Sequence, residues 1–98
     1  MTIHKIENGT ELTMILGGRL DTTTAPELEA ALNESLTNLT LLTMDFAALE
    51  YISSAGLRVL LSTQKVMNKQ GKMILKHVNE AILEVLEITG FTDILTIE

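Results

Sequence analysis

The chain of 98 residues contains no cysteine, one proline and only three aromatic side chains. Without cysteine it has no disulfide framework, no thiol nucleophile and no zinc site built from thiolates. The scarcity of proline argues against a linker or a low-complexity segment. The apolar runs are short and interrupted, and the N-terminus shows no secretion signal, so neither membrane insertion nor export is predicted. These absences predict a cytoplasmic protein domain.

Acidic residues outnumber basic ones by thirteen to seven, which gives a net charge of −6 and an isoelectric point near 4.8. A chain this acidic repels a phosphate backbone, and three aromatics offer no platform for stacking bases, so no nucleic-acid partner is expected. One stretch without acids is basic, and it contains Arg58, Lys65, Lys69, Lys72 and Lys76. We interpret it as a solvated helix face rather than as a partner-binding patch, since its later lysines suit the negative end of a helix dipole.

A hydrophobic content of 46% is enough for one core, and the length suits a single domain over residues 1–98. Alternating and helical periodicities divide the chain into strands and helices. Strands are expected at 3–7, 12–16, 40–45, 73–78 and 94–97, and helices from about 25 to 37, from 54 to 70 and from 80 to 89. The order strand, strand, helix, strand, helix, strand, helix, strand predicts right-handed crossovers. We therefore expect an α/β fold, a small mixed β-sheet with helices mainly on one face.

Polar residues and glycines mark the expected ends of these elements. A capping box of Thr24 and Glu27 begins the first helix. The second strand is expected to end at the pair Gly17 and Gly18, and residues 46–52 are expected to form a connection. The remaining end signals are a hairpin turn, one N-cap and two C-terminal caps, at Asn8–Glu11, Asn79, Gly71 and Gly90.

The sequence lacks the patterns of common small enzymes. Ser53–Gly56 looks like a nucleophile elbow, but that motif needs glycine two residues before the serine, where Ile52 stands. Asp45 ends a predicted central strand, as in phospho-accepting receiver domains, yet the acidic pair and the late lysine of receivers are missing. We interpret Asp45 as a turn residue that stops its strand. His4 and His77 lie on predicted strands without metal-ligand spacing, so we expect no catalytic residue, no metal and no cofactor.

Ser53 and Ser54 stand where a buried strand passes to the helix predicted to be the most buried one. Serine is a preferred N-cap residue, worth about 1 kcal/mol, and the residues alone favour this structural role. The same place also suits a phosphorylation site. A phosphate there would meet free backbone N–H groups and the positive end of the helix dipole.

Three segments resemble the STAS-domain anti-sigma factor antagonists, in the family's order and spacing along nearly the whole chain. The longest is Asp45–Leu61, with the sequence DFAALEYISSAGLRVLL, which resembles the family signature. Leu20–Leu28, LDTTTAPEL, looks like the start of the family's first helix. Thr89–Phe91 looks like its turn before the last strand. The resemblance implies a single STAS domain over residues 1–98.

The resemblance also implies a protein that exchanges partners when it is phosphorylated. In this family the unphosphorylated antagonist binds an anti-sigma factor, which is also a serine kinase, and thereby frees a sigma factor. The kinase uses ATP to phosphorylate a serine at the start of the second helix, and a metal-dependent serine phosphatase reverses the reaction. Aligned at Gly56 and Leu57, that serine matches Ser54, with Ser53 as the alternative acceptor.

The partner-binding surface is expected to surround this serine, with Gly56 allowing close approach. Its expected members are Asp21, Thr22, Thr23, Thr24, Ser53, Ala55, Gly56 and Arg58. The chain would supply the substrate hydroxyl and the kinase the catalysis, so the chain itself is not expected to be an enzyme. One alternative is a STAS scaffold module of another signalling assembly or a transport system, without a phospho-switch. Another is a small enzyme or nucleotide-binding protein, which turnover or tight ligand binding would reveal.

Overall fold

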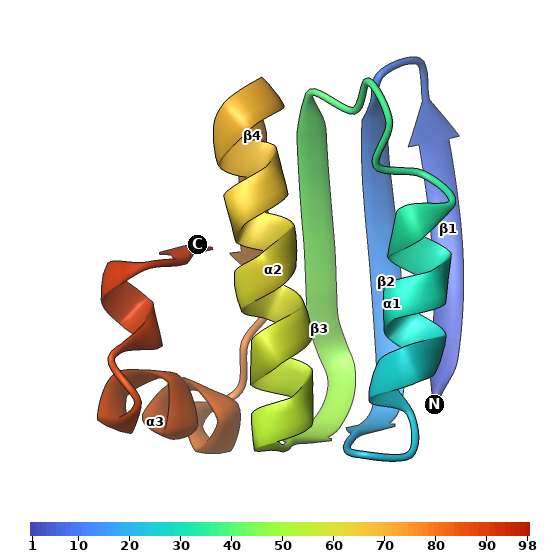
Figure 1. Ribbon diagram of the computed structural model, residues 1–98. Coiled ribbons are helices and arrows are strands. Elements are labelled where there is room, and N and C mark those ends of the chain that lie inside the picture. The colour runs from blue at the N-terminus through green and yellow to red at the C-terminus, as the bar shows by residue number, and fades with distance from the viewer.

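The computed structural model describes residues 1–98 as a mixed α/β protein (Figure 1). The strands are β1 (Thr2–Asn8), β2 (Glu11–Leu20), β3 (Leu41–Ile52), β4 (Lys72–Lys76) and β5 (Thr96–Ile97). The helices are α1 (Ala25–Asn33), α2 (Ser54–Gln70) and α3 (Glu80–Ile88), and a short 3-10 helix covers Phe91–Asp93. The order of strands and α-helices is the one that the sequence predicts.

The strands form one mixed sheet in the order β1-β2-β3-β4-β5. β1 and β2 are antiparallel neighbours joined by a tight hairpin, whereas β2, β3, β4 and β5 run parallel. Parallel neighbours require crossover connections, which α1, α2 and α3 provide. As a result, β2 and β3 end on the same side of the molecule, and α1 and α2 begin there (Figure 1).

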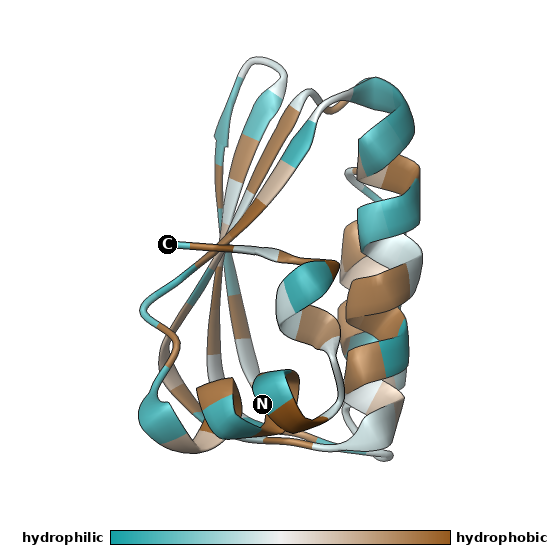
Figure 2. Ribbon diagram, turned by 90° about the vertical axis from the view of Figure 1, so that its left-hand side faces the viewer, coloured by the Kyte–Doolittle hydropathy of each residue, from teal (hydrophilic) through white to brown (hydrophobic).

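The core lies between the sheet and the helices α1 and α2, which pack beside each other on one face (Figures 1 and 2). Alternate residues of the central strands point into this core, as period-two alternation requires. On β2 and β3 they are Leu12, Met14, Leu16, Leu42, Met44 and Phe46. The residues between them, such as Thr13 and Thr43, are half-buried on the opposite face. The expected fold class is therefore confirmed. None of the helices has the length and hydrophobicity that crossing a membrane requires.

β2 continues through the glycine pair, so the expectation that Gly17 and Gly18 end this strand is wrong. A Cβ at Gly17 would lie 2.5 Å from Thr2 Oγ1, so a side chain here would require the exposed Thr2 side chain to move. Gly18 has a φ of 87°, in the left-handed region that favours glycine. The two glycines thus lie where the pairing of β2 with β3 is irregular, and the strand continues past them to Leu20.

Residues 46–52 belong to β3, and the expected connection there is wrong. The register between β2 and β3 shifts after Ile15 and again after Gly18, because β3 contains one extra residue each time. The first irregularity is supported by Asp45, whose Oδ1 accepts a hydrogen bond from the N–H of Ala47 at 2.9 Å. Asp45 therefore supports a bulge within its strand and does not stop it. The bulges also explain why the alternating pattern is lost in this segment.

Some helix ends lie where the sequence predicts them and others do not. α2 spans the predicted range, whereas α1 ends at Asn33 and not near residue 37. The expected capping box does not form, because Thr24 Oγ1 donates to the carbonyl oxygen of Arg19 at 2.7 Å and caps no helix N–H. Asn79 does cap α3, since its Oδ1 accepts from the N–H of Ile82 at 2.8 Å. The last two strands are shorter than predicted, β4 ending at residue 76 and β5 beginning at residue 96.

Candidate functional site

The first turn of α2 is tied to the ends of two neighbouring strands. The N–H of Ser53 donates to the carbonyl oxygen of Leu20 at 2.9 Å, and the carbonyl oxygen of Ser53 accepts from the N–H of Leu57 at 3.0 Å. Ser53 itself is extended, with φ −104° and ψ 175°, and the helix begins at Ser54. The end of β2 and the start of α2 are therefore held together at the carboxyl ends of the parallel strands.

The two serines have different environments. Ser54 is exposed at the first residue of α2 and makes no side-chain hydrogen bond within the protein. Ser53 is the N-cap residue, yet its side chain makes no capping hydrogen bond, and its Oγ is buried without a partner. The helix therefore receives no cap from Ser53, contrary to the structural role that the residues alone favour. Of the two, Ser54 is the serine that faces solvent.

Gly56 brings the first turn of α2 into contact with the sheet. A Cβ at this position would lie 2.6 Å from Leu20 Cγ and 3.0 Å from Ile52 Cγ1. Both of those side chains are buried, so neither has free space into which it could move. The close approach expected at Gly56 is thus an internal contact between helix and sheet, and Gly56 itself is buried.

The loop between β2 and α1 is closed by its own polar groups. Asp21 Oδ1 accepts hydrogen bonds from the backbone N–H groups of Thr23 (3.0 Å) and Thr24 (3.1 Å). In the other direction, the N–H of Asp21 donates to Thr24 Oγ1 at 2.8 Å. This is the hydrogen-bond pattern of an Asx turn, and the bond from Thr24 Oγ1 to the carbonyl oxygen of Arg19 ties the loop to the end of β2. Thr22 and Thr23 are left exposed at its tip.

The charge of Asp21 is stabilised by these contacts. The N–H of Thr24 is the main cause that holds the pKa of Asp21 below its ordinary value of 3.8. The N–H of Thr23 and the guanidinium of Arg19 act in the same direction, while partial burial opposes them. Arg19 Nε lies 3.7 Å from Asp21 Oδ2. Asp21 is therefore ionised at neutral pH and engaged inside its own loop.

Arg19 and Tyr51 are two residues of this edge that the sequence analysis misses. The two are paired across β2 and β3, and the Arg19 guanidinium lies 4.1 Å from the centre of the Tyr51 ring, a cation–π arrangement. Both side chains are exposed. They are missed because the sequence-based strands end before residues 19 and 51. The sequence signal that could have found them is the presence of an arginine and a tyrosine beside the two predicted loops.

Three of the eight residues expected to bind a partner line one open hollow of about 200 Å³ between the loop and α2. Its lining includes Thr22, Ala55 and Arg58, together with Ala25 and Pro26 from the start of α1. The hollow shares Glu29 and Val59 with a further hollow of about 90 Å³ between α1 and α2. The structure therefore brings the expected 21–24 and 53–58 segments together, with a groove continuing between the two helices.

The exposed side of α2 is basic along its length. Arg58, Lys65 and Lys69 are all exposed, and residues 54–70 contain no acid. Arg58 follows Ser54 by four residues, Lys65 follows Arg58 by seven, and Lys69 follows Lys65 by four. These spacings place the three cations on one side of the helix. They face solvent and form no ion pair, as expected of a solvated helix face.

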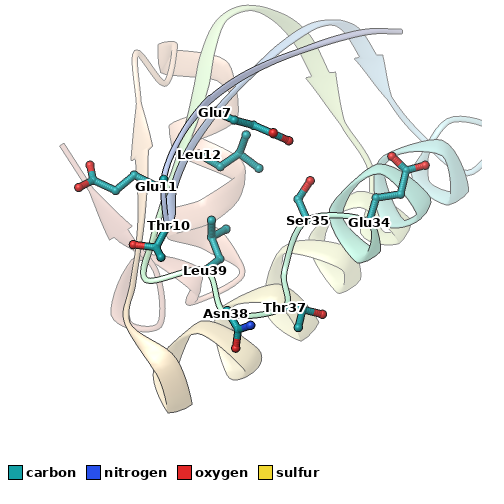
Figure 3. Close-up of a pocket in the computed structure, with 10 residues that line it drawn as sticks. Glu7, Thr10, Glu11, Leu12, Glu34, Ser35, Thr37, Asn38 and Leu39 are labelled. Atoms are coloured by element: carbon teal, nitrogen blue, oxygen red, sulfur yellow. The ribbon is translucent and has the colours of Figure 1, made fainter.

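A separate hollow of about 260 Å³ lies at the opposite end of the parallel strands, beside the β1–β2 hairpin (Figure 3). Glu7, Glu34 and Ser35 lie around it, with Thr37 and Asn38 from the loop after α1. No cluster of three or more acidic, histidine or cysteine side chains is placed to hold a metal ion. This hollow contains none of the residues expected to bind a partner.

The two histidines lie away from the first turn of α2. His4 is exposed on β1, and His77 lies one residue beyond β4, so its predicted place on a strand is wrong. His77 Nδ1 is 2.9 Å from Asp45 Oδ1. This contact, together with the stronger effect of the Ala47 N–H, lowers the pKa of Asp45 below its ordinary value of 3.8. His77 thus packs onto the bulge of β3.

Comparison with known proteins identifies the family of the chain. The family model for the STAS domain matches residues 2–98, so the chain belongs to the STAS domain family. BtrV of Bordetella bronchiseptica, whose name describes it as an anti-sigma factor antagonist, is 35% identical over 96 residues. The match covers 96% of this chain and 81% of that protein. The family resemblance that the sequence motifs indicate is confirmed.

Solved structures share the fold. An anti-sigma factor antagonist from Mycobacterium paratuberculosis superimposes with a TM-score of 0.89 at 23% identity, over 98% of this chain and 83% of the other. The unphosphorylated form of the anti-sigma factor antagonist SpoIIAA gives a TM-score of 0.84 at 16% identity, over 99% of this chain and 88% of the other. The phosphorylated form of Bacillus SpoIIAA gives 0.77 at the same identity, over 99% and 91%. At these identities the likeness establishes the fold.

Replacing Ser53 by alanine is expected to change the free energy of unfolding by less than about 0.5 kcal/mol. A capping serine is typically worth about 1 kcal/mol, but the buried Ser53 Oγ makes no hydrogen bond that alanine would remove. Asn79→Ala is the comparison variant, because it removes a cap that does form and also the bond from Asn79 Nδ2 to the carbonyl oxygen of Leu49, and it should cost at least about 1 kcal/mol. Urea denaturation of both variants measures the difference. Equal losses would show that Ser53 caps α2 in solution.

Acid is expected to destabilise the protein through Asp21 and Asp45. Both have a folded-state pKa below 3.8, so their contribution to stability is present above that value and is lost as the pH falls through the lower, folded-state pKa. Asp21→Asn and Asp45→Asn should each make the loss of stability below about pH 4 less steep. Urea denaturation at a series of acidic pH values measures this slope. Asp93→Asn, an exposed position without side-chain hydrogen bonds, is the control, and an equal effect there would contradict the assignment.

Proposed function

We propose that this STAS domain is an anti-sigma factor antagonist. In its unphosphorylated form it binds an anti-sigma factor that is also a serine kinase, and this binding frees a sigma factor. The observation that carries the proposal is the solvent-facing hydroxyl of Ser54 at the first residue of α2, beside the fixed loop of residues 21–24. The relationship to BtrV supports it, as does the shared fold with SpoIIAA, which has been solved with and without phosphate.

Ser54 is the phosphate acceptor in this proposal. The kinase transfers a phosphoryl group from ATP to Ser54 Oγ, and a metal-dependent serine phosphatase removes it. The chain supplies only the hydroxyl group, and catalysis belongs to its two partners. Ser53, the alternative acceptor, would first have to expose a buried Oγ. Residues 1–98 act here as one STAS domain in the cytoplasm.

The first turn of α2 can hold a phosphate without unfolding. It contains no acidic side chain, and its free N–H groups form the positive end of the helix dipole. Arg58 lies one turn further along the same side of the helix, where side chains four residues apart are neighbours. A phosphate brings a charge of about −1.5 to −2 at neutral pH, which these groups stabilise in the free domain.

The same phosphate would prevent the complex from forming. The proposed partner surface is formed by Asp21, Thr22, Thr23, Thr24, Ser53, Ala55 and Arg58, of which Thr22, Ala55 and Arg58 line the hollow. Gly56 is buried and contributes by holding the first turn of α2 against the sheet. A partner that covers this surface removes Ser54 from water. A phosphate left there without a matching cation loses its hydration, and that loss costs several kcal/mol. Phosphorylation therefore releases the kinase to bind the sigma factor again.

The Ser54→Asp variant is expected to stay folded and to lose its partner. Aspartate suits the positive helix end, so the free energy of unfolding should change by less than about 1 kcal/mol. Binding to the cognate kinase should weaken at least tenfold, about 1.4 kcal/mol, because a charge enters the interface. Ser54→Ala should still bind and should resist inactivation by ATP. Thermal melts and titrations against the kinase measure both properties.

Phosphopeptide mapping after incubation with the kinase and ATP tests the assignment of the acceptor. Ser53→Ala is the matched control, and it should be phosphorylated on Ser54 like the wild type. Phosphate on Ser53 alone would reverse the assignment. Phosphate on neither serine would favour the scaffold module, and equal binding by Ser54→Asp and Ser54→Ala would contradict a switch.

Charge changes around the hollow are expected to weaken the complex while the fold is kept. Arg58→Glu and Thr22→Glu alter exposed side chains that line the hollow, and each should lower the affinity for the kinase by about tenfold, or 1.4 kcal/mol. Lys72→Glu makes the same charge change as Arg58→Glu, at the opposite end of the parallel strands, and should leave binding unaffected. Titration calorimetry measures the affinities. Wild-type affinity in both hollow variants would remove this surface from the interface.

A further inference from the structure

The two edges of the sheet are protected to different degrees. β5 forms one edge with only two residues, and short edge strands offer little backbone for pairing. β1 forms the other edge with seven residues, and it pairs on one side only, with β2 (Figure 1). Its other side presents unpaired backbone N–H and C=O groups along Thr2–Asn8.

β1 lacks two features with which proteins usually block an exposed edge, a proline and a bulge. It contains no proline, and its register with β2 is uninterrupted from residue 2 to residue 8, so no bulge twists it away. Lys5, its one lysine, is turned onto the helical side. The Lys5 ammonium lies 3.2 Å from Glu34 Oε2 and 2.9 Å from Ser35 Oγ. The lysine that could guard this edge is therefore engaged within its own chain.

The side chains of β1 are complementary to a second copy of β1. Ile6 is 51% exposed and lies on the open face of the sheet, next to Thr13 of β2. Lys5 and Glu7 lie on the helical side and carry opposite charges. The strand is thus locally neutral in a chain of net charge −6, so two copies meet here with less repulsion than over most of the surface.

We propose that β1 binds β1 of a second copy of this chain, antiparallel, about a two-fold axis through Ile6. In this register Ile6 lies opposite Ile6 of the other copy, Lys5 lies opposite Glu7, and His4 lies opposite Asn8. A register centred on Lys5 would set two lysines against each other, and one centred on Glu7 would do the same with two glutamates. Like charges directly opposite destabilise a sheet, so the register centred on Ile6 is the favoured one.

The hollow beside the hairpin adds to the attraction. Glu7 and Glu34 both lie around it, so it is acidic (Figure 3). In the proposed pair, Lys5 of each copy approaches Glu7 of the other at the rim of this hollow. Because the axis is perpendicular to the sheet, both helical layers lie on one face of the joined sheet. Ser54 remains exposed in each copy, since α2 begins away from β1.

Sedimentation over a range of protein concentration tests the pairing. The wild type should rise toward twice the 10.8 kDa of one chain as its concentration increases. Glu7→Lys sets lysines against Lys5, and its dissociation constant should rise at least about tenfold. Lys5→Glu combined with Glu34→Lys sets glutamates against Glu7 while it keeps the ion pair within the chain. The dissociation constant of this double variant should rise by the same factor.

Mixing these two variants in equal amounts is the decisive measurement. In the mixed pair every lysine again lies opposite a glutamate, so the mixture should dimerise although each variant alone does not. Glu84→Lys on α3 is the charge-matched control and should dimerise like the wild type, and thermal melts check that each variant is folded. Ile6→Lys sets two lysines at the axis and should also be monomeric. A wild type that stays at 10.8 kDa, an Ile6→Lys variant that dimerises normally, or a mixture no heavier than its components would overturn the proposal.

Discussion

The contact between Gly56 and the sheet is the constraint on which the candidate site depends. Gly56 packs against Leu20 and Ile52, the last residues of β2 and β3, with no space for a side chain of its own. Because the N–H of Ser53 is bound to the carbonyl of Leu20, α2 cannot shift along the sheet without breaking that bond. The next residue, Ser54, is therefore placed beside the loop that leaves β2. Core packing thus determines which serine is buried and which is exposed.

The polar groups beside Ser54 divide into those used within the protein and those left for a partner. The Asp21 carboxylate and the Thr24 hydroxyl hold the loop closed, so they fix its shape and offer little to a partner. Thr22 and Thr23 are exposed and uncharged, and Arg58 adds one cation nearby. A rigid surface with so few free charges needs little rearrangement to bind, and a single phosphate changes its electrostatic character strongly.

The sequence is a good guide where one local signal determines the structure. α2 follows from its helical apolar spacing, and Asn79 caps α3 through its own side chain. It is a poor guide where a distant strand decides. Gly17 meets the side chain of Thr2 only through the pairing of β2 with β1, and the bulge at Asp45 exists only against β2. The proximity of the two loops follows from strand order, whereas the burial of the Ser53 hydroxyl depends on packing that no motif encodes.

The distribution of charge explains how one modification can control binding without affecting the fold. α2 has three basic residues and no acid, so it carries +3 while the rest of the chain carries −9. A phosphate on Ser54 offsets half or more of that charge, at about −1.5 to −2. These cations are exposed and form no ion pairs, so their neutralisation breaks no contact of the native state. The buried face of α2 beneath them is apolar apart from Thr63 and Gln64, and it carries no charge. In the proposed switch, stability and partner binding would therefore depend on different faces of the same helix.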